Sequence, residues 1–144
     1  MKITFTKSFA LLLLSASFFT GCSKSSKTKT EYLTEKTWTQ TARGYDYNNN
    51  WTIESSENYL ASCDKDNIWT FKNNGTLIED EVGVRCYTAT QWSYDWEISS
   101  DDKKLIIDSR TYTIKTIDSY TLELYYDYES SNGPVRYIRK FVHQ

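Results

Sequence analysis

The stretch Gln91-Trp92-Ser93-Tyr94-Asp95-Trp96-Glu97-Ile98 alternates strictly between polar side chains and large aromatic or apolar ones. Successive side chains of an extended chain point to opposite faces, so one face of this segment carries Trp92, Tyr94, Trp96 and Ile98. A strand with one apolar and one polar face is typical of an antiparallel sheet that covers a core on one side and meets water on the other. The segment therefore predicts an all-β domain.

The same alternation returns on both sides of this segment, between turn signals such as Asn74-Gly75, a pair that suits a tight hairpin. We expect eight or nine strands, with the others near residues 37–42, 51–54, 68–71, 76–81, 105–108, 112–117, 121–128 and 135–142. The connections between them are short, which indicates an up-and-down antiparallel meander. A meander of about eight strands tends to close into a barrel, and a β-sandwich is the alternative.

The charge of the chain limits its partners. The 144 residues include 17 Lys and Arg and 19 Asp and Glu. Five lysines and no acidic residue precede Glu31, so the part from Glu31 onward holds 12 basic and 19 acidic residues, a net charge of −7. Proteins that bind nucleic acid present a basic face, so we expect no nucleic-acid partner.

The N-terminal segment predicts export. A basic start is followed by the apolar run 8–19, which is shorter than the roughly 20 apolar residues of a membrane-spanning helix and fits a secretory signal peptide. Thr20-Gly21-Cys22 comes next and resembles the lipobox of bacterial lipoproteins. That resemblance implies a signal peptide over residues 1–21, lipidation of Cys22 and stable attachment to a membrane, because two or more acyl chains anchor firmly.

Residues 22–30 are rich in Ser, Lys and Thr and contain no apolar residue after Cys22, so we expect a lipidated flexible tether. Surface-exported lipoproteins of the Bacteroidota often carry acidic residues at this place, whereas this tether is basic. Ser23 resembles the sorting signal for the outer membrane in enterobacteria. We therefore expect an outer-membrane location with the domain, residues 31–144, facing the periplasm; surface exposure is the alternative.

With Cys22 acylated, Cys63 and Cys86 remain. Two cysteines in an exported domain most often form one disulfide. A metal site would need more ligands than two thiols, and the single histidine, His143, stands next to the C-terminus. We expect a Cys63–Cys86 disulfide, no metal and no cofactor.

Several features follow one another in a recognisable order: Trp38 on the first strand, Cys63 before the strand with Trp69 and Phe71, the Asn74-Gly75 turn, Cys86, and Trp92 on the next strand. In this order they resemble the lipocalin-like domain of small Bacteroidota lipoproteins. The resemblance covers residues 31–143 and implies an eight-stranded barrel with bridged cysteines. It implies little about function, because one fold serves many functions.

Aromatic residues are the strongest remaining signal for function. The candidates for an inner wall are Trp69, Phe71, Trp92, Tyr94, Trp96, Tyr126 and Tyr128. They predict either a cavity that binds a small apolar or amphipathic ligand, or a barrel filled by its own side chains, since an eight-stranded barrel is just wide enough for both.

A second set, Tyr45, Tyr47 and Trp51, lies in or beside the Gly/Asn-rich segment 44–50, which we expect to be an exposed loop at the barrel mouth. Aromatic rings next to Asn suit a glycan or a protein partner, so an interaction module is the alternative function. The same rings could equally fold over the end of the barrel.

Catalysis has little support in the sequence. His143 is expected at a frayed terminus, and the chain contains neither a Gly-x-Ser-x-Gly elbow nor a Gly-rich phosphate loop. The acidic group Glu79-Asp80-Glu81 is expected to be a solvated strand end, and Asp64-Lys65-Asp66-Asn67 a polar turn. We therefore expect a non-catalytic protein without catalytic residues.

Overall fold

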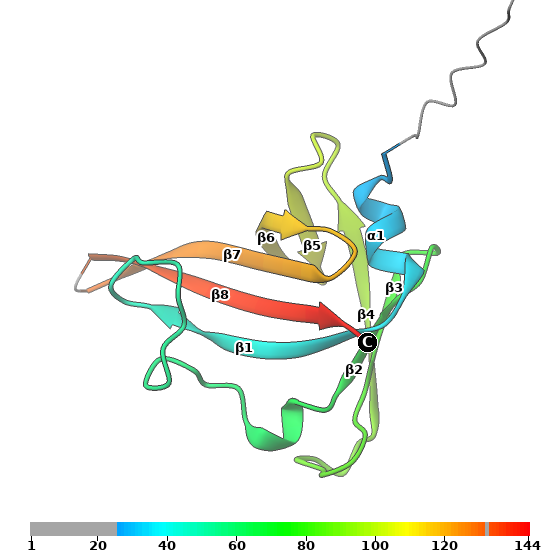
Figure 1. Ribbon diagram of the computed structural model, residues 1–144, viewed down its shortest axis with the longest axis horizontal. Coiled ribbons are helices and arrows are strands. Elements are labelled where there is room, and N and C mark those ends of the chain that lie inside the picture. The colour runs from blue at the N-terminus through cyan, green and yellow to red at the C-terminus, as the bar shows by residue number, and fades with distance from the viewer. Residues whose placement is uncertain (1–25, 132) are drawn as a thin grey trace, which may run out of the picture.

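The computed structural model describes residues 26–131 and 133–144. They form one short α-helix followed by eight antiparallel strands, which close into a barrel (Figure 1). The elements are α1 (Lys29–Glu35), β1 (Trp38–Asp46), η1 (Ser62–Asp64), β2 (Ile68–Phe71), β3 (Thr76–Asp80), β4 (Gln91–Ile98), β5 (Lys104–Ile107), β6 (Arg110–Ile117), β7 (Thr121–Ser130) and β8 (Gly133–His143). Each strand pairs with the next in sequence, and β8 pairs with β1. The predicted up-and-down barrel is confirmed and the sandwich is excluded.

The predicted signal peptide and Cys22 lie outside the described residues. Within the described part of the chain, no helix has the length and apolar character that crossing a membrane requires.

The prediction of a strand at residues 51–54 is wrong, and the first strand is longer than predicted. β1 continues to Asp46 because its second half pairs with β8, for example Tyr45 with Tyr137. The Asp46 carboxylate then accepts the backbone N–H groups of Asn50 at 3.0 Å and Trp51 at 2.9 Å, which turns the chain away from the barrel. Trp51 itself has a φ of 66°, a left-handed conformation that a strand does not contain.

The helix α1 was not predicted, although Thr28 and Glu31 have the spacing of a capping box. Thr28 accepts the N–H of Glu31 at 3.2 Å through its hydroxyl, and the Glu31 carboxylate accepts the N–H of Thr28 at 2.6 Å, which is a capping box. Leu33 is buried, and the Trp38 indole donates to the Leu33 carbonyl at 3.0 Å. Lys29 and Thr30, placed in the tether by sequence, thus belong to a helix packed against the barrel.

The two ends of the barrel differ. The closed end holds α1, the turns 72–75, 99–103 and 118–120, and the C-terminus; the mouth end holds the connections 47–67, 81–90 and 108–109 (Figure 1). His143 ends β8 at the closed end, its ring centroid 3.6 Å from that of Trp38, and its backbone N–H donates to Tyr120 at 3.0 Å. The expected frayed terminus is therefore wrong, because pairing of β8 with β1 closes the barrel there.

The long connection 47–67 folds back along β1. The Tyr59 N–H donates to the Arg43 carbonyl at 2.7 Å, and Gly44 forms an isolated bridge with Asn58. The Glu57 carboxylate accepts the N–H groups of Tyr47 and Glu54, both at 3.1 Å. These bonds fix the connection against the strand with no space for a side chain at Gly44.

Replacing Gly44 with Ala should lower the free energy of unfolding by about 1–3 kcal/mol, the usual cost of overpacking. A Cβ atom at this position would lie 1.9 Å from the Glu57 carbonyl oxygen, so backbone must move. Urea titration followed by tryptophan fluorescence measures the loss. Thr41→Ala, on the same strand at an exposed position, is the control and should stay within about 0.5 kcal/mol. Equal midpoints for the Gly44 variant and the wild type would contradict the close packing.

Candidate functional site

The inward-facing side chains change character from the closed end to the mouth. The closed half is filled by a buried apolar cluster that includes Leu33, Trp38, Phe71, Leu77, Trp96, Leu105, Leu122 and Phe141. Alternation along the strands then places Glu79 on the same face as Leu77, and Arg139 on the same face as Phe141. The interior is therefore apolar and filled at one end, and lined by charged and aromatic side chains toward the other.

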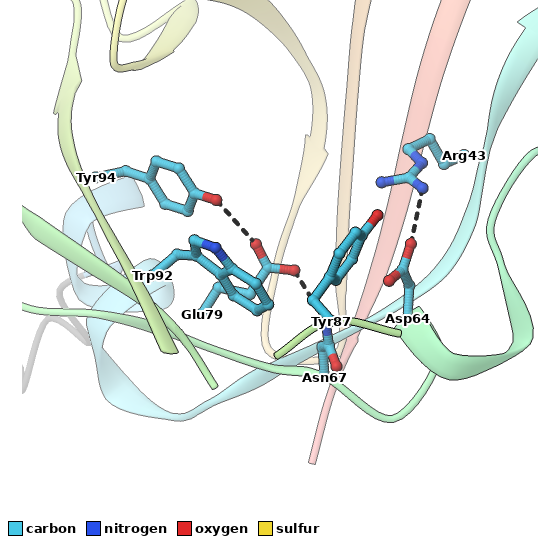
Figure 2. A pocket seen from close by; sticks show the side chains of 7 residues that line it. All are labelled: Arg43, Asp64, Asn67, Glu79, Tyr87, Trp92 and Tyr94. Carbon is cyan, nitrogen blue, oxygen red and sulfur yellow. Dashed lines mark hydrogen bonds and ion pairs between the residues drawn. The ribbon is translucent and has the colours of Figure 1, made fainter. Parts of the chain in front are cut away.

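Adjoining hollows occupy the polar half. The first has a volume of about 240 Å³ and the second about 380 Å³, and both are lined by Arg43, Glu79 and Tyr94. A third, of about 670 Å³, meets the second at Ser109 and Arg110 and extends to the rim. The second and the third each have a volume in the range of small-molecule sites. Figure 2 shows the first hollow, with Glu79 between Tyr94 on one side and the pair of Arg43 and Asp64 on the other.

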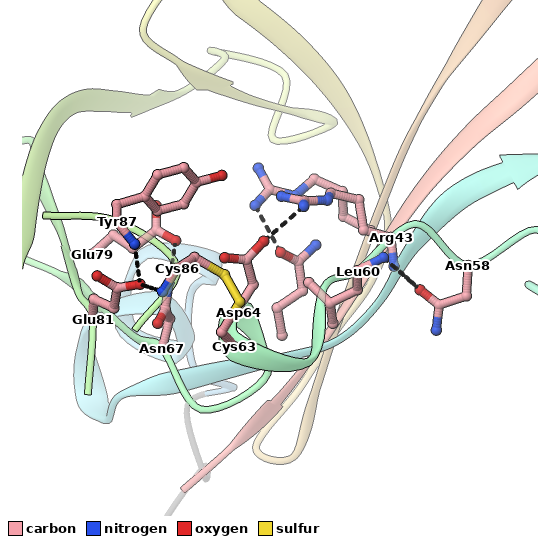
Figure 3. Close-up of polar contacts among 12 residues, drawn as sticks. Arg43, Asn58, Leu60, Cys63, Asp64, Asn67, Glu79, Glu81, Cys86 and Tyr87 are labelled. Carbon is pink, nitrogen blue, oxygen red and sulfur yellow. Dashed lines mark hydrogen bonds and ion pairs between the residues drawn. A yellow bond between two sulfur atoms is a disulfide. The ribbon is translucent and has the colours of Figure 1, made fainter. Parts of the chain in front are cut away.

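One wall of the first hollow is an ion pair. Arg43 on β1 donates from Nη2 to the Asp64 carboxylate at 2.9 Å, and Asp64 is buried. Asp64 ends η1, whose Cys63 is bonded to Cys86 in the connection 81–90, so the predicted disulfide is confirmed (Figure 3). The disulfide holds this wall to the neighbouring connection 81–90 at the mouth, because β2, which follows η1, pairs with β3, which precedes that connection.

Acidic side chains also hold the connection 81–90 in place. The buried Glu81 carboxylate accepts the backbone N–H groups of Cys86 and of Tyr87, the latter at 3.2 Å. The expectation that Glu79-Asp80-Glu81 is solvated is therefore wrong for Glu79 and Glu81. Their strand does not end in water, because the connections 47–67 and 81–90 cover it.

Glu79 is the carboxyl group at the centre of the site. It accepts a hydrogen bond from the Asn67 amide at 3.1 Å and another from the Tyr94 hydroxyl at 3.3 Å. Burial raises the pKa of Glu79, and nearby Asp64 adds to the rise, while Asn67, Arg139 and Tyr94 act against it. Burial, together with the Glu79 carboxylate, raises the pKa of Tyr94 to about 12. Tyr94 therefore remains a hydroxyl donor at neutral pH, and Glu79 takes up a proton more readily than an exposed glutamate.

The raised pKa of Glu79 predicts a pH dependence of stability. A group that binds its proton more tightly when folded contributes stability below its unfolded pKa, here about 4.5, and loses that contribution as pH rises through the folded pKa. Glu79→Gln keeps the size and shape of the side chain but replaces the carboxyl group with an amide, which does not titrate. The free energy of unfolding of Glu79→Gln relative to wild type should therefore increase as the pH rises from about 4 to about 8.

Urea titrations at several pH values measure this difference. Glu97→Gln, which removes an exposed carboxylate on β4, corrects for the general effect of one lost charge. A difference for Glu79→Gln that stays constant, or that falls as the pH rises, would contradict the assignment.

Arg139 on β8 is the buried cation of the second hollow, with 7% of its surface exposed. Its Nη2 donates to the Gln40 side-chain oxygen at 3.1 Å. The guanidinium lies 4.5 Å from the ring centroid of Trp69 and 5.1 Å from that of Phe141. Within residues 26–131 and 133–144, Arg139 forms no ion pair and its Nε has no hydrogen-bond partner. Aromatic faces, not a carboxylate, surround this charge.

Tyrosines line the path from Arg139 to the rim. Tyr126 stacks on Tyr137 with ring centroids 4.9 Å apart, Tyr112 meets Tyr126 edge-on at 5.7 Å, and Tyr45 meets Tyr137 at 5.1 Å. Burial raises the pKa of Tyr126 to about 12 and also raises the pKa of Tyr137. These residues therefore offer uncharged hydroxyl groups and ring faces, which suits a molecule with both apolar and polar parts.

The seven aromatic candidates for the ligand site fall into two groups. Phe71 and Trp96 are buried in the closed half, where their rings meet edge-on at 5.3 Å. The other five line the hollows: Trp69, Trp92, Tyr94, Tyr126 and Tyr128. The two alternatives from the sequence were a ligand cavity and a barrel filled by its own side chains. Each describes one half of the barrel, since the closed half is filled and the other half is open.

The structure separates the three candidates for an interaction loop. Tyr45 and Tyr47 lie together at the rim with ring centroids 6.0 Å apart, beside Tyr59. Trp51 lies against the outer wall, 5.0 Å from Tyr125, with the Arg136 guanidinium 3.6 Å from its ring centroid. Trp51 therefore does not share a surface with the two tyrosines.

Arg43, Glu79 and Arg139 were not predicted as site residues. Alternation gives the signal for two of them, because Leu77 fixes the face of Glu79, and Tyr137 with Phe141 fixes the face of Arg139. Arg43 had no such signal. A register shift between Gln40 and Ala42 reverses the alternation, so that Arg43 faces inward together with Trp38.

Only one group of possible metal ligands comes together in the described ranges: Cys63, Asp64 and Cys86, whose ligand atoms lie within 4.8 Å of one another. The two sulfur atoms are joined in the disulfide, and the carboxylate accepts from Arg43. The group therefore offers no thiolate to a metal.

A scan against protein-family models and a search of the curated proteins return no match. Among solved structures, the chain is similar to a complex of bovine odorant binding protein with a selenium-containing odorant. That similarity has 12% sequence identity and a TM-score of 0.45, over 84% of this chain and 76% of the other. The assignment as an eight-stranded up-and-down barrel follows from the strand order and pairing of this chain itself.

Proposed function

We propose that this protein binds one small amphipathic molecule in the open half of its barrel and does not transform it. The observation that carries this proposal is the series of hollows from the rim to Arg139, in a barrel whose other half is filled. A wholly apolar ligand would take water away from Arg139 and Glu79 and offer no polar group in its place, which is costly. The lining therefore supports an amphipathic ligand over an apolar one.

Native mass spectrometry of the full chain, extracted in mild detergent from the cells that produce it, tests the proposal. The native mass should exceed the denatured mass by a few hundred daltons. Ser109→Trp, which narrows the path where two hollows meet, should remove the extra mass, whereas Ser100→Trp at the closed end should keep it. Equal native and denatured masses for the wild type would count against a retained ligand.

A protein or glycan partner at the mouth is the second candidate function. The rim tyrosines favour it, since Tyr47 is 56% exposed and Tyr59 is 53% exposed, with their hydroxyl oxygens 3.2 Å apart. This candidate gains support if the wild type retains no small molecule and if Tyr47→Ala weakens binding on a glycan array. Retention of a ligand that Ser109→Trp abolishes supports the first function instead.

For location, we propose a lipid anchor on Cys22 in the outer membrane, with the domain facing the periplasm. The support is the sequence before Glu31, and α1 begins at Lys29, so the tether between anchor and barrel is short. Metabolic labelling with palmitate and membrane fractionation test it. Cys22→Ser should lose the label and leave the membrane fraction; continued sedimentation with membranes would contradict the anchor.

A further inference from the structure

Among the described residues, the charge balance of the polar half leaves one buried cation, Arg139, without a direct ion pair. Arg43 is paired with Asp64 at 2.9 Å, whereas no carboxylate oxygen of the described residues lies within 4.0 Å of an Arg139 nitrogen. Arg139 is nevertheless among the most buried polar residues of the barrel, and its Nε lacks a partner there. Burying an unpaired charge is costly unless a partner compensates it. The open space beside this guanidinium is the place where such a partner would fit.

The other groups around the hollow limit the charge of that partner. Besides Arg139, the charged residues that line this hollow are Arg43, which is paired with Asp64, and Asp108, Arg110 and Glu79. Glu79 opposes a second negative charge in the same space. The surroundings therefore favour an anion with one negative charge over a dianion such as a phosphate monoester.

The tyrosines indicate what the remainder of the ligand is like. Between Arg139 and the rim, the walls include the rings of Tyr112, Tyr126 and Tyr137, which carry hydroxyl groups at their ends. Such walls suit a flat or apolar body better than a chain of charges. The two halves of the path thus correspond to an anionic group inside and an apolar body toward the mouth.

We propose that the ligand is an amphipathic organic acid with one negative charge, whose acid group lies against the Arg139 guanidinium and whose apolar body lies among the mouth tyrosines. This inference rests on the proposed function and adds the ligand class to it. An acid oxygen there accepts charge-assisted hydrogen bonds from the guanidinium and compensates its charge. Arg139 is then the residue that selects acids over neutral molecules of the same shape.

Two fluorescent probes that differ in one group test the proposal on the full chain. The anionic probe is 8-anilinonaphthalene-1-sulfonate, and the neutral probe is N-phenyl-1-naphthylamine, which lacks the sulfonate. Arg139→Met should lower the affinity for the anionic probe by about 10- to 100-fold, the range for losing a hydrogen bond to a charged group. The affinity for the neutral probe should stay nearly unchanged. Glu79→Gln should raise the affinity for the anionic probe and not that for the neutral probe, because it removes a negative charge from the same hollow.

Arg85→Met is the matched control: it removes an exposed arginine at the mouth end, outside the hollows, and should leave both affinities unchanged. Binding of the neutral probe to Arg139→Met shows that the cavity has formed in that variant. If both probes bind wild type and Arg139→Met equally well, the acid class is overturned while the binding function stands. If neither probe binds wild type and no ligand is retained in native mass spectra, the binding function itself fails.

Discussion

Phe71→Ala should lower the free energy of unfolding by about 3–5 kcal/mol, the range for truncating a buried aromatic residue. Phe71 is 2% exposed and lies in the filled half, edge-on to Trp96 with ring centroids 5.3 Å apart. The strands around it cannot collapse into the vacated space without breaking the barrel, so a cavity should remain. Urea denaturation followed by circular dichroism gives the change in free energy.

Tyr128→Ala is the comparison for the open half. Tyr128 faces the rim and is 50% exposed, so its loss should cost less than about 1 kcal/mol. Similar losses for Phe71→Ala and Tyr128→Ala would contradict the division of the barrel into a filled half that supplies stability and an open half that does not.

The second large effect should come from the disulfide. Replacing both Cys63 and Cys86 with Ser should lower the free energy of unfolding by about 3 kcal/mol in the chain-entropy model. The two residues are 23 positions apart, and the bond joins η1 to the connection 81–90 at the mouth end of the barrel. Thermal and urea unfolding of this variant beside the wild type measure the effect.

The same variant should loosen the wall that carries Asp64, because η1 loses its covalent tie. Backbone amides of residues 81–90 should then exchange with deuterium faster, while those of the closed-end strand β5 keep their protection. The wild type treated with a reductant should reproduce both changes. Unchanged stability together with unchanged exchange would mean that the hydrogen bonds of this loop, which include those to Glu81 and Asp66, hold it without the disulfide.

The strands of this barrel were predictable because each one covers a core on one side only. The segment 91–98 is the clearest case, and β4 spans the same residues, Gln91–Ile98. The failure at 51–54 has a local cause, since Asp46 binds two backbone N–H groups and turns the chain. The helix was predictable from Thr28 and Glu31, whose spacing is that of a capping box.

The site was less predictable than the fold. Acidic residues at a strand end usually meet water, yet Glu79 lies inside because two connections far apart in sequence are joined over it by the disulfide. The inward position of Arg43 depends on an irregularity in β1. Whether a barrel of this size is filled or open depends on the packing of every inward side chain, which alternation does not determine.

The central claim is that the open half of the barrel holds an organic acid against Arg139. The most direct measurement is the NMR resonance of the Arg139 Nε–H group, assigned by its absence in Arg139→Met, during titration with the two naphthyl probes. We predict a large shift with the sulfonate probe and little change with the neutral one. Saturable binding of the sulfonate probe with no change in this resonance would show that the acid group lies elsewhere, and would contradict the account.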